Sequence, residues 1–198
     1  PFERVTGKGT RGWFSLGSTG DMPLAVVNME DPGYEHHRGF ITQAFTNSFL
    51  ENIKQGKFYR GGSTITMQLA KNIWLSREKT LGRKAQELFL SQALESCYSK
   101  DEILELYLNV VEFGPNQYGI GPGAMHWFHK GPGELEPREA FWLASILPRP
   151  SRTPPPDESS LKRISSLMKQ LSKTGRIPDY MTEIEEDVPP PEDGDSQR

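Results

Sequence analysis

The chain has 198 residues, of which 35% are hydrophobic and 25% charged, so it can bury one core without disulfides or a structural metal. Its single cysteine, Cys97, excludes an intrachain disulfide and a cysteine-ligated zinc site. The longest clean apolar run, residues 141–147, is far shorter than the roughly 20 residues of a membrane span. The chain begins at Pro1 without a signal-peptide pattern, and we expect a longer parent protein whose anchor is absent from this chain.

The net charge of −3 conceals an uneven distribution. Residues 178–198 carry eight acidic side chains against Arg198, which gives −7 and leaves +4 for residues 1–177. Residues 54–84 hold eight cationic side chains and one acidic side chain. This excess predicts an anionic partner, and charge alone leaves a phosphate, a nucleic acid and an anionic membrane surface open.

The first helix is predicted from its two ends. Residues 1–20 are rich in Gly, Ser and Thr and predict an irregular segment. Asp21 is typical of an N-cap, and Pro32-Gly33 ends the apolar helix that follows. Glu30 and Asp31 therefore stand at the end of a buried helix, where an unpaired charge is costly.

Caps and periodicity predict the next four helices. They run over residues 40–53, from the N-cap Ser63 to Leu75, from Thr80 to Tyr98, and from the capping-box pattern Ser99–Glu102 to Val111. For the helix that begins at Thr80 we expect an inward face formed by Leu81, Ala85, Leu88, Phe89 and Ala93.

The rest of the chain is predicted as a Gly-rich loop, three helices and a tail. The loop covers residues 114–123, and the helices lie near 124–128, at 137–147 and around 161–171, with Gly175 as the last C-cap. Residues 149–157 form a Pro-rich linker before the last helix, and the acidic residues 176–198 are expected to be disordered. We therefore expect a mainly α domain over residues 21–175.

Two segments concentrate groups suited to catalysis. Glu30-Asp31 lies near His37 and Gly39, and a desolvated carboxylate there would have a pKa useful to a general base; a solvated helix end is the alternative. Residues 61–72 combine two glycines with three hydroxyls at a helix N-terminus, an arrangement that attracts anions, although ordinary capping explains part of it.

A third segment places Arg83, Lys84 and Glu87 on one side of a helix. The two cations predict a cradle for phosphate, with a surface ion pair as the alternative. A fourth segment, residues 100–121, is a helix and a Gly-rich turn for which packing is at least as good an explanation as direct chemistry.

Together, in this order, these segments resemble the signatures of the peptidoglycan glycosyltransferases of family 51. The pattern E-D-x-x-F-x-x-H-x-G lies over Glu30–Gly39 with Tyr34 at the Phe position, and G-G-S-T-I-T-Q-Q-x-x-K-N lies over Gly61–Asn72 with Met67 replacing a Gln. R-K-x-x-E is Arg83–Glu87, and I-L-x-x-Y-L-N is Ile103–Asn109. The chain is most similar to the monofunctional members of the family.

The resemblance implies a lysozyme-like, two-lobed helical domain with a cleft between the lobes. It also implies polymerisation of lipid II into β-1,4-linked glycan strands, with release of undecaprenyl pyrophosphate. Glu30 would be the general base for the acceptor hydroxyl in one inverting displacement. Glu87 would act on the donor pyrophosphate directly or through a divalent cation, Mg or Mn, for which it is the candidate ligand.

The same resemblance implies the substrate-binding residues. They are Asp31, His37, Gly61, Gly62, Ser63, Thr64, Gln68, Lys71, Asn72, Lys79, Arg83 and Lys84. The sequence departs from the family pattern at Thr46-Asn47, where Arg-Ala is usual, at Lys79, usually Arg, and at Gln86, often basic. The departures at Thr46-Asn47 and Gln86 remove cations that would bind phosphate, and Lys79 keeps the charge without the planar bidentate guanidinium.

The implied partners are lipid II, the growing glycan chain and the bacterial membrane surface, which residues 40–60 would contact. Penicillin-binding proteins and cell-division or elongation proteins are further candidates. No nucleic acid is expected as a partner. The implied location is the periplasmic, outer face of the cytoplasmic membrane. Two alternatives stay open at this point. One is an inactive module that binds lipid II or scaffolds the cell-wall machinery, and the other is a glycan hydrolase, since paired carboxylates serve that chemistry too.

Overall fold

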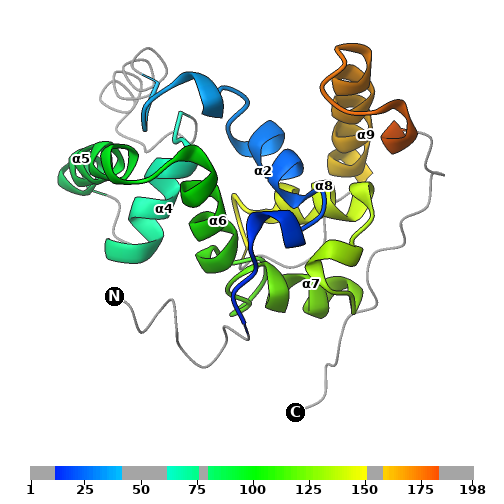
Figure 1. The fold of residues 1–198 in the computed structure, drawn as a ribbon, viewed down its shortest axis with the longest axis horizontal. Helices are drawn as coiled ribbons and strands as arrows, with labels where there is room; N and C mark the ends of the chain where they lie inside the picture. Colours follow the sequence, from blue (N-terminus) through cyan, green and yellow to red (C-terminus); the bar gives the residue numbers. More distant parts are fainter. Residues whose placement is uncertain (1–11, 42–61, 76–79, 151–157, 183–198) are drawn as a thin grey trace.

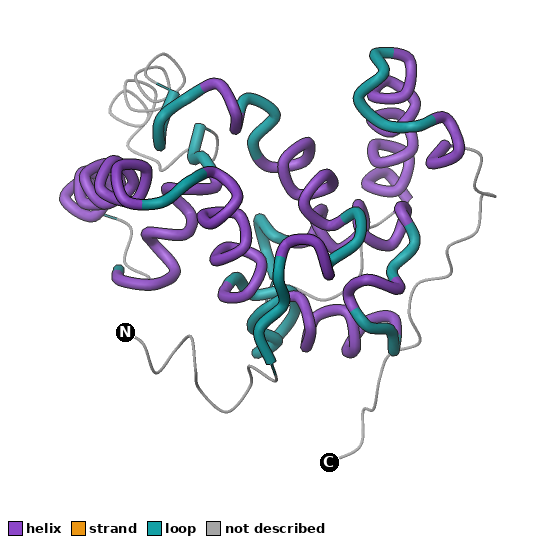
Figure 2. The backbone as a smooth tube through the Cα atoms, viewed as in Figure 1, coloured by secondary structure: helices purple, strands orange, loops and turns teal. Residues whose placement is uncertain are grey.

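The computed structural model describes residues 12–41, 62–75, 80–150 and 158–182. Within these ranges the regular structure is helical apart from one antiparallel bridge between Glu112 and Tyr118, which confirms the mainly α prediction (Figures 1 and 2). Residues 42–53 of the helix expected over 40–53 and residues 151–157 of the linker expected over 149–157 lie outside the described residues, and residues 40 and 41 are not helical.

Seven α-helices and four short 3-10 helices follow one another in the described part of the chain. In order they are η1 (Leu16–Ser18), α2 (Met22–Glu30), η2 (Tyr34–His36), α4 (Ile65–Trp74), α5 (Leu81–Cys97), α6 (Lys100–Val110), α7 (Ile120–Phe128), η3 (Pro132–Glu134), α8 (Pro137–Ile146), α9 (Glu158–Lys173) and η4 (Asp179–Thr182).

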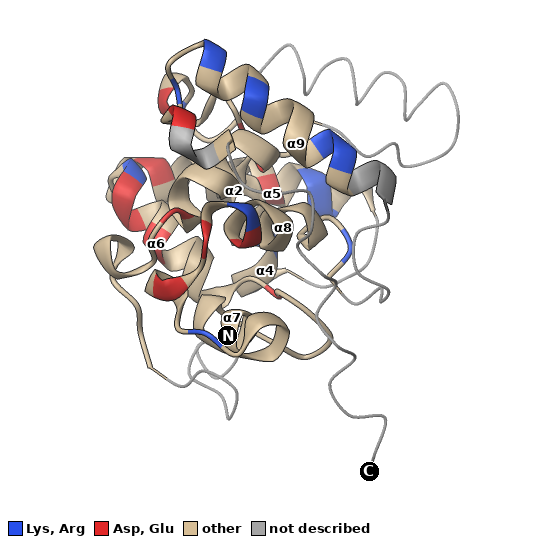
Figure 3. Ribbon diagram, turned by 90° about the vertical axis from the view of Figure 1, so that its right-hand side faces the viewer, with Lys and Arg blue, Asp and Glu red and all other residues tan. Residues whose placement is uncertain are grey.

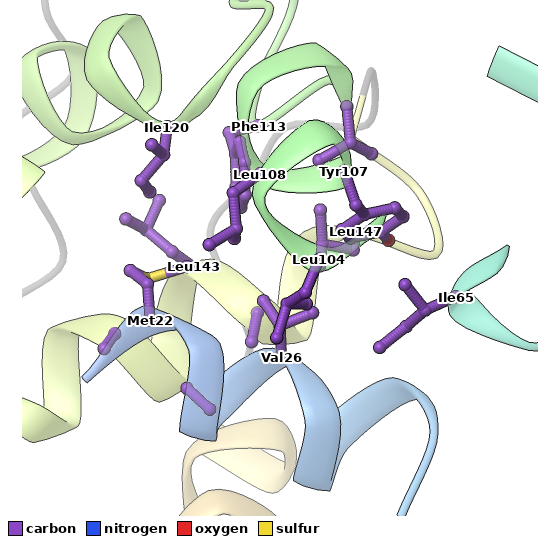
Figure 4. Packing of buried hydrophobic residues seen from close by; sticks show 14 of the residues in the cluster. Met22, Val26, Ile65, Leu104, Tyr107, Leu108, Phe113, Ile120, Leu143 and Leu147 are labelled. Carbon is purple, nitrogen blue, oxygen red and sulfur yellow. The ribbon is translucent and has the colours of Figure 1, made fainter. Parts of the chain in front are cut away.

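The helices pack pairwise against one another around one hydrophobic core. α4 packs against α5 and α6, α6 against α7, α2 along α8, and α9 on α8 (Figure 1). Figure 4 shows side chains from α2, α4, α6, α7 and α8 meeting in the interior, among them Val26, Leu108 and Leu143. The core thus fixes α2 and α4 relative to α6, which matters because the candidate site lies on these elements. The division into two lobes with a cleft stays a prediction.

Local capping signals set several helix ends as predicted. The Thr80 hydroxyl accepts a hydrogen bond from the Arg83 amide at the start of α5, and Ser99 and Glu102 form the expected capping box of α6. After α9, Gly175 has a φ of +66°, which lets the amide of Arg176 bond back to the carbonyl of Leu171 at 2.9 Å.

The predicted inward face of α5 is wrong. Phe89 is 76% exposed, and Ala85 and Ala93 are exposed as well, whereas Glu87 and Ser91 are buried. The backbone of Ser91 lies so close to Gly39 that a Cβ on Gly39 would be 3.1 Å from the Ser91 carbonyl carbon. The buried side of the helix therefore combines the polar Glu87 and Ser91 with Leu94, and the helix packs against α4.

Two other boundaries also differ from the prediction. α7 begins at Ile120, four residues before the expected start, because Pro122 falls in the first helical turn, where its missing N–H is not needed. The tail, expected to be disordered from residue 176, instead continues as η4, and Ile177 is buried against the core. Residues 183–198 lie outside the described chain.

The N-terminal segment contacts α6 through two side chains of that helix. Glu105 accepts hydrogen bonds from the Trp13 indole at 2.7 Å and from the Leu16 amide at 2.9 Å. Asn109 both accepts from the amide and donates to the carbonyl of Phe14. The asparagine of the fourth motif therefore has a structural contact, as the packing interpretation of that segment predicts.

Candidate active site

Glu30 is the last residue of α2, and the sequence of that helix explains its position. Met22, Ala25 and Val26 are fully buried, so the helix is held by its apolar side. The helix ends where the amide of Asp31 bonds to the carbonyl of Val27. Glu30 is left partly exposed at the edge of the core.

A chain of two hydrogen bonds connects Glu30 to the core. The Nε2 group of Gln68, on α4, donates to Glu30 Oε2 at 2.9 Å. The hydroxyl of Tyr107, on α6, donates to Gln68 Oε1 at 2.9 Å. Side chains from three helices therefore join in this chain of bonds, and the donor that Gln68 offers to Glu30 is a neutral amide.

The surroundings of Glu30 raise its pKa above the ordinary value of 4.5, and burial is the main cause. The negative charge of Asp31 also raises the pKa. The hydrogen bond from Gln68 and the positive charges of Lys71 and Arg163 act in the opposite direction. A carboxylate with a raised pKa accepts a proton more readily, as a general base requires.

Asp31 has a different environment, although it follows Glu30 directly. It is 3% exposed, and its two oxygens accept from His37 Nε2 at 3.0 and 2.9 Å. Its Oδ2 also accepts from the amide of Ile65, at the start of α4, at 3.1 Å. Asp31 and His37 thus fix the N-terminus of α4 beside the end of α2.

Thr64, rather than the predicted Ser63, is the N-cap of α4. The Thr64 hydroxyl accepts from the amide of Met67 at 3.2 Å and donates to the carbonyl of Gly39. Ser63 has another partner, because its hydroxyl accepts from Lys84 Nζ at 2.7 Å. The two neighbouring hydroxyls therefore have different partners: Thr64 caps the start of α4, and Ser63 contacts Lys84 on α5.

Glu87 and the two cations before it form the second cluster. Lys84 Nζ lies 2.7 Å from Glu87 Oε2, and Arg83 Nη2 lies 3.4 Å from Glu87 Oε1. Glu87 is 2% exposed, whereas both cations keep some exposure. The Nε of Arg83 and Oε1 of Glu87 have no hydrogen-bond partner among the described residues. The cluster has a net charge of +1 with donors left over, which suits an anionic group.

α4 and the segment before it connect the surroundings of Glu30 with the cluster of Glu87, Arg83 and Lys84. Gln68 on α4 reaches Glu30, and the Ser63 hydroxyl just before the helix reaches Lys84. Gly62 directly precedes Ser63 in the segment before α4. Lys71, on α4, acts on Glu30 through its charge. Asn72 lies half-buried near the end of α4. The predicted site residues Gly61 and Lys79, and the departure at Thr46-Asn47, fall outside the described residues.

Sequence reasoning missed two residues near Glu30. Tyr107 stands in the fourth motif, but its helix was explained by packing, and nothing local connects it to Gln68. Arg163 is on α9, whose exposed side carries basic residues, while residues 159–178 contain no acid (Figure 3). No sequence signal places Arg163 near Glu30, since 133 positions separate them.

No group of three or more His, Cys, Asp or Glu side chains in the described ranges is arranged to hold a metal ion. Glu87 is already paired with two cations, so it offers a single carboxylate without a second protein ligand nearby.

The helical domain carries one partly buried carboxylate, Glu30, and a second carboxylate, Glu87, that is paired with two cations. This arrangement is typical of enzymes that use acid–base chemistry on an anionic substrate. Comparison with known proteins narrows this class. The model of the transglycosylase family matches residues 8–172, and the chain belongs to that family. Both carboxylates and the α4 N-terminus lie within the match.

Curated relatives carry the name biosynthetic peptidoglycan transglycosylase. One from Nitrosomonas eutropha is 45% identical over 126 residues, 64% of this chain and 52% of the relative. One from Alcanivorax borkumensis is 41% identical over 169 residues, 84% of this chain and 67% of the relative. One from Pasteurella multocida is 39% identical over 157 residues, 78% and 63% of the two chains. The chain thus spans between about half and two thirds of the length of these relatives.

Proposed function

We propose that this chain polymerises lipid II into β-1,4-linked glycan strands of peptidoglycan and releases undecaprenyl pyrophosphate. The observation that carries the proposal is the pair of carboxylates: Glu30, whose pKa is raised by burial, and Glu87, held between Lys84 and Arg83. Membership of the transglycosylase family and the name of the relatives support the same reaction.

In this reaction Glu30 takes the proton of the acceptor 4-hydroxyl. The freed oxygen forms a bond to the anomeric carbon of the donor sugar while the bond from that carbon to the pyrophosphate breaks, so the configuration inverts. Gln68 occupies Oε2 of Glu30, which leaves Oε1 for the proton. Negative charge develops on the leaving pyrophosphate, and donors arranged in advance lower the barrier there.

Arg83 and Lys84 are the residues suited to that leaving group. Both keep part of their surface exposed beside the buried Glu87, and the Nε of Arg83 has no partner in the described structure. A Mg or Mn ion, which the resemblance implies as a cofactor, would be held by Glu87 together with the pyrophosphate oxygens. No step of the proposed reaction passes through such an ion.

We further propose that the protein acts at the outer face of the bacterial cytoplasmic membrane, where a lipid-linked substrate is used. Support comes from the substrate class implied by the family. In the described ranges no helix has the length and hydropathy needed to cross a membrane. Contacts with the membrane surface and with penicillin-binding, division or elongation proteins remain predictions.

The test is incubation of the full 198-residue chain with fluorescent lipid II, detergent and magnesium, followed by separation of the products on a gel. We expect a ladder of glycan polymer that disappears in Glu30→Gln and persists in Glu35→Gln. Glu35 is a matched control because it is an exposed glutamate five residues further along the chain. Binding of lipid II without any ladder from the unchanged chain would instead assign a lipid II-binding module.

A further inference from the structure

The chain of hydrogen bonds behind Glu30 contains a tyrosine that the proposed reaction does not use. Tyr107 is fully buried, and its ring lies in the core between α4, α6 and α8 (Figure 4). Its hydroxyl is aimed at Gln68 Oε1, and burial raises its pKa, so the group stays protonated and able to donate. The hydroxyl therefore contributes a fixed donor at a buried position.

That donor decides which end of the Gln68 amide faces Glu30. A glutamine amide has one accepting oxygen and one donating NH₂ group. With the oxygen bound to Tyr107, the NH₂ group faces Glu30 Oε2. A flipped amide would present its oxygen to Glu30 instead, and an oxygen there is favourable only when Glu30 is protonated.

We propose that Tyr107 is a positioning residue, whose hydroxyl holds the Gln68 amide so that its NH₂ group binds Oε2 of Glu30 and leaves Oε1 to the substrate hydroxyl. The assignment of Oε1 to the substrate rests on the proposed function. The orientation of the amide does not, because it follows from the two hydrogen bonds alone.

The charged groups around Glu30 come from three elements. They are Lys71 on α4, Arg163 on α9 and Asp31 directly after α2. Their fields act on Glu30 whichever way the amide points. Loss of the Tyr107 hydroxyl would thus change one contribution to the pKa of Glu30, namely the hydrogen bond from Gln68.

Tyr107→Phe removes one oxygen and keeps the ring. We expect the pKa of Glu30 to rise by about one unit, because a freely rotating amide stabilises the protonated acid. The acid limb of the pH profile of kcat should move up with it, so that at pH values on that limb kcat falls about tenfold. At pH values well above the limb the loss should be small.

Two comparison variants distinguish a positioning role of the Tyr107 hydroxyl from a role in packing alone. Tyr34→Phe removes the hydroxyl of another fully buried tyrosine, which donates to the carbonyl of Lys100 at 2.8 Å and is not bonded to Gln68. Gln68→Met removes the amide from a partly exposed position on α4 with little change in size. We expect Tyr34→Phe to leave the pKa of Glu30 unchanged and Gln68→Met to raise it.

The decisive experiment is a double-mutant cycle read by NMR titration of labelled glutamate side chains in the substrate-free chain. The Glu30 signal is assigned by its loss in Glu30→Gln. The proposal predicts that Tyr107→Phe adds nothing once Gln68→Met is present. An unchanged pKa in Tyr107→Phe overturns it, as does a shift that persists in the double variant.

The cycle also separates this proposal from the proposed function. If the predicted pKa pattern appears but the unchanged chain makes no polymer, the positioning role stands and the proposed function fails. If polymer forms but the pattern is absent, the reverse holds. Should Tyr107→Phe not fold, Gln68→Met alone decides, because a Glu30 pKa that does not rise without the amide contradicts the proposal.

Discussion

Glu30 and Glu87 are the same residue type on neighbouring parts of one site, yet their environments differ in almost every respect. Glu30 ends a helix, is partly exposed and accepts from a neutral amide. Glu87 lies in the middle of α5, is almost completely buried and touches two cations. Burial raises the pKa of Glu30 and so favours its protonated form.

The comparison shows that the surroundings of a carboxylate, rather than its residue type, determine its chemical role. A buried carboxylate that accepts from a neutral amide can exchange a proton, and one held between two cations organises positive charge for an anion. The two residues should therefore respond in opposite ways to the same neutralising substitution, and that opposition can be measured.

Glu30→Gln should have the largest effect. We expect glycan polymerisation to fall by about 10² to 10⁴-fold, the usual contribution of a general base. The fold should gain stability at neutral pH, because Glu30 has a raised pKa in the folded chain. Ionising it weakens the fold as the pH rises from the ordinary value of 4.5 through the folded-state pKa, and glutamine removes that cost.

Thermal unfolding at about pH 4 and about pH 8 measures the stability part of this prediction. The advantage of Glu30→Gln over the unchanged chain should be greater at the higher pH. A variant that is less stable than the unchanged chain, and more so at the higher pH, would contradict the buried, weakly paired environment of Glu30.

Glu87→Gln should act in the opposite direction. It leaves Lys84 and Arg83 facing each other beside a buried amide, and removing one partner of a buried ion pair costs about 2–3 kcal/mol when the other partners keep some exposure. Denaturant unfolding measures this loss, with Glu35→Gln as the exposed control. Stability equal to that control would show that the Glu87 cluster does not contribute to the fold.

The sequence predicts those features of the site that depend on neighbours along the chain. Arg83, Lys84 and Glu87 share a helix face, and the first helix ends at Glu30, as the local signals indicate. The cap of α4 was misplaced by one residue because two distant groups decide it. Thr64 binds the carbonyl of Gly39, and Ser63 binds Lys84.

The inward face of α5 could not be predicted from apolar periodicity alone, because polar side chains share the buried side with Leu94. Phe89 is exposed, while Glu87 and Ser91 are buried against α4 and the loop after α2. Tyr107 and Arg163 could not be predicted for the same reason. Each lies on a helix far from Glu30 in the sequence, Tyr107 connected to it through Gln68 and Arg163 acting on it through its charge. Tertiary contacts, rather than periodicity, place these residues.

Arg83→Lys sharpens the interpretation of the Glu87 cluster by keeping the charge and removing the planar fork. We expect the KM for lipid II to rise several-fold with a smaller change in kcat, since an ammonium group binds a phosphate at fewer points. Stability should change by less than about 0.5 kcal/mol, because charge balance is kept. Steady-state kinetics checks this, with Arg138→Lys on α8 as the matched control.

An unchanged KM in Arg83→Lys would show that the guanidinium does not contact the substrate. An equal rise in Arg138→Lys would point instead to a general effect of the substitution, because Arg138 bonds to Ser165 on α9 and has no contact with Glu87.

Arg163→Gln should have the smallest effect, and it tests whether cations act on Glu30 only from a distance. The charge of Arg163 lowers the pKa of Glu30, so its removal should move the acid limb of the pH profile up by a few tenths of a unit. Because Arg163 is exposed, added salt should remove most of this shift. Lys173→Gln, about 15 Å further along α9, should leave the limb in place. Equal shifts in both variants would mean that α9 acts through its total charge, whereas a shift for Arg163 alone would confirm that Glu30 responds to one cation it does not touch.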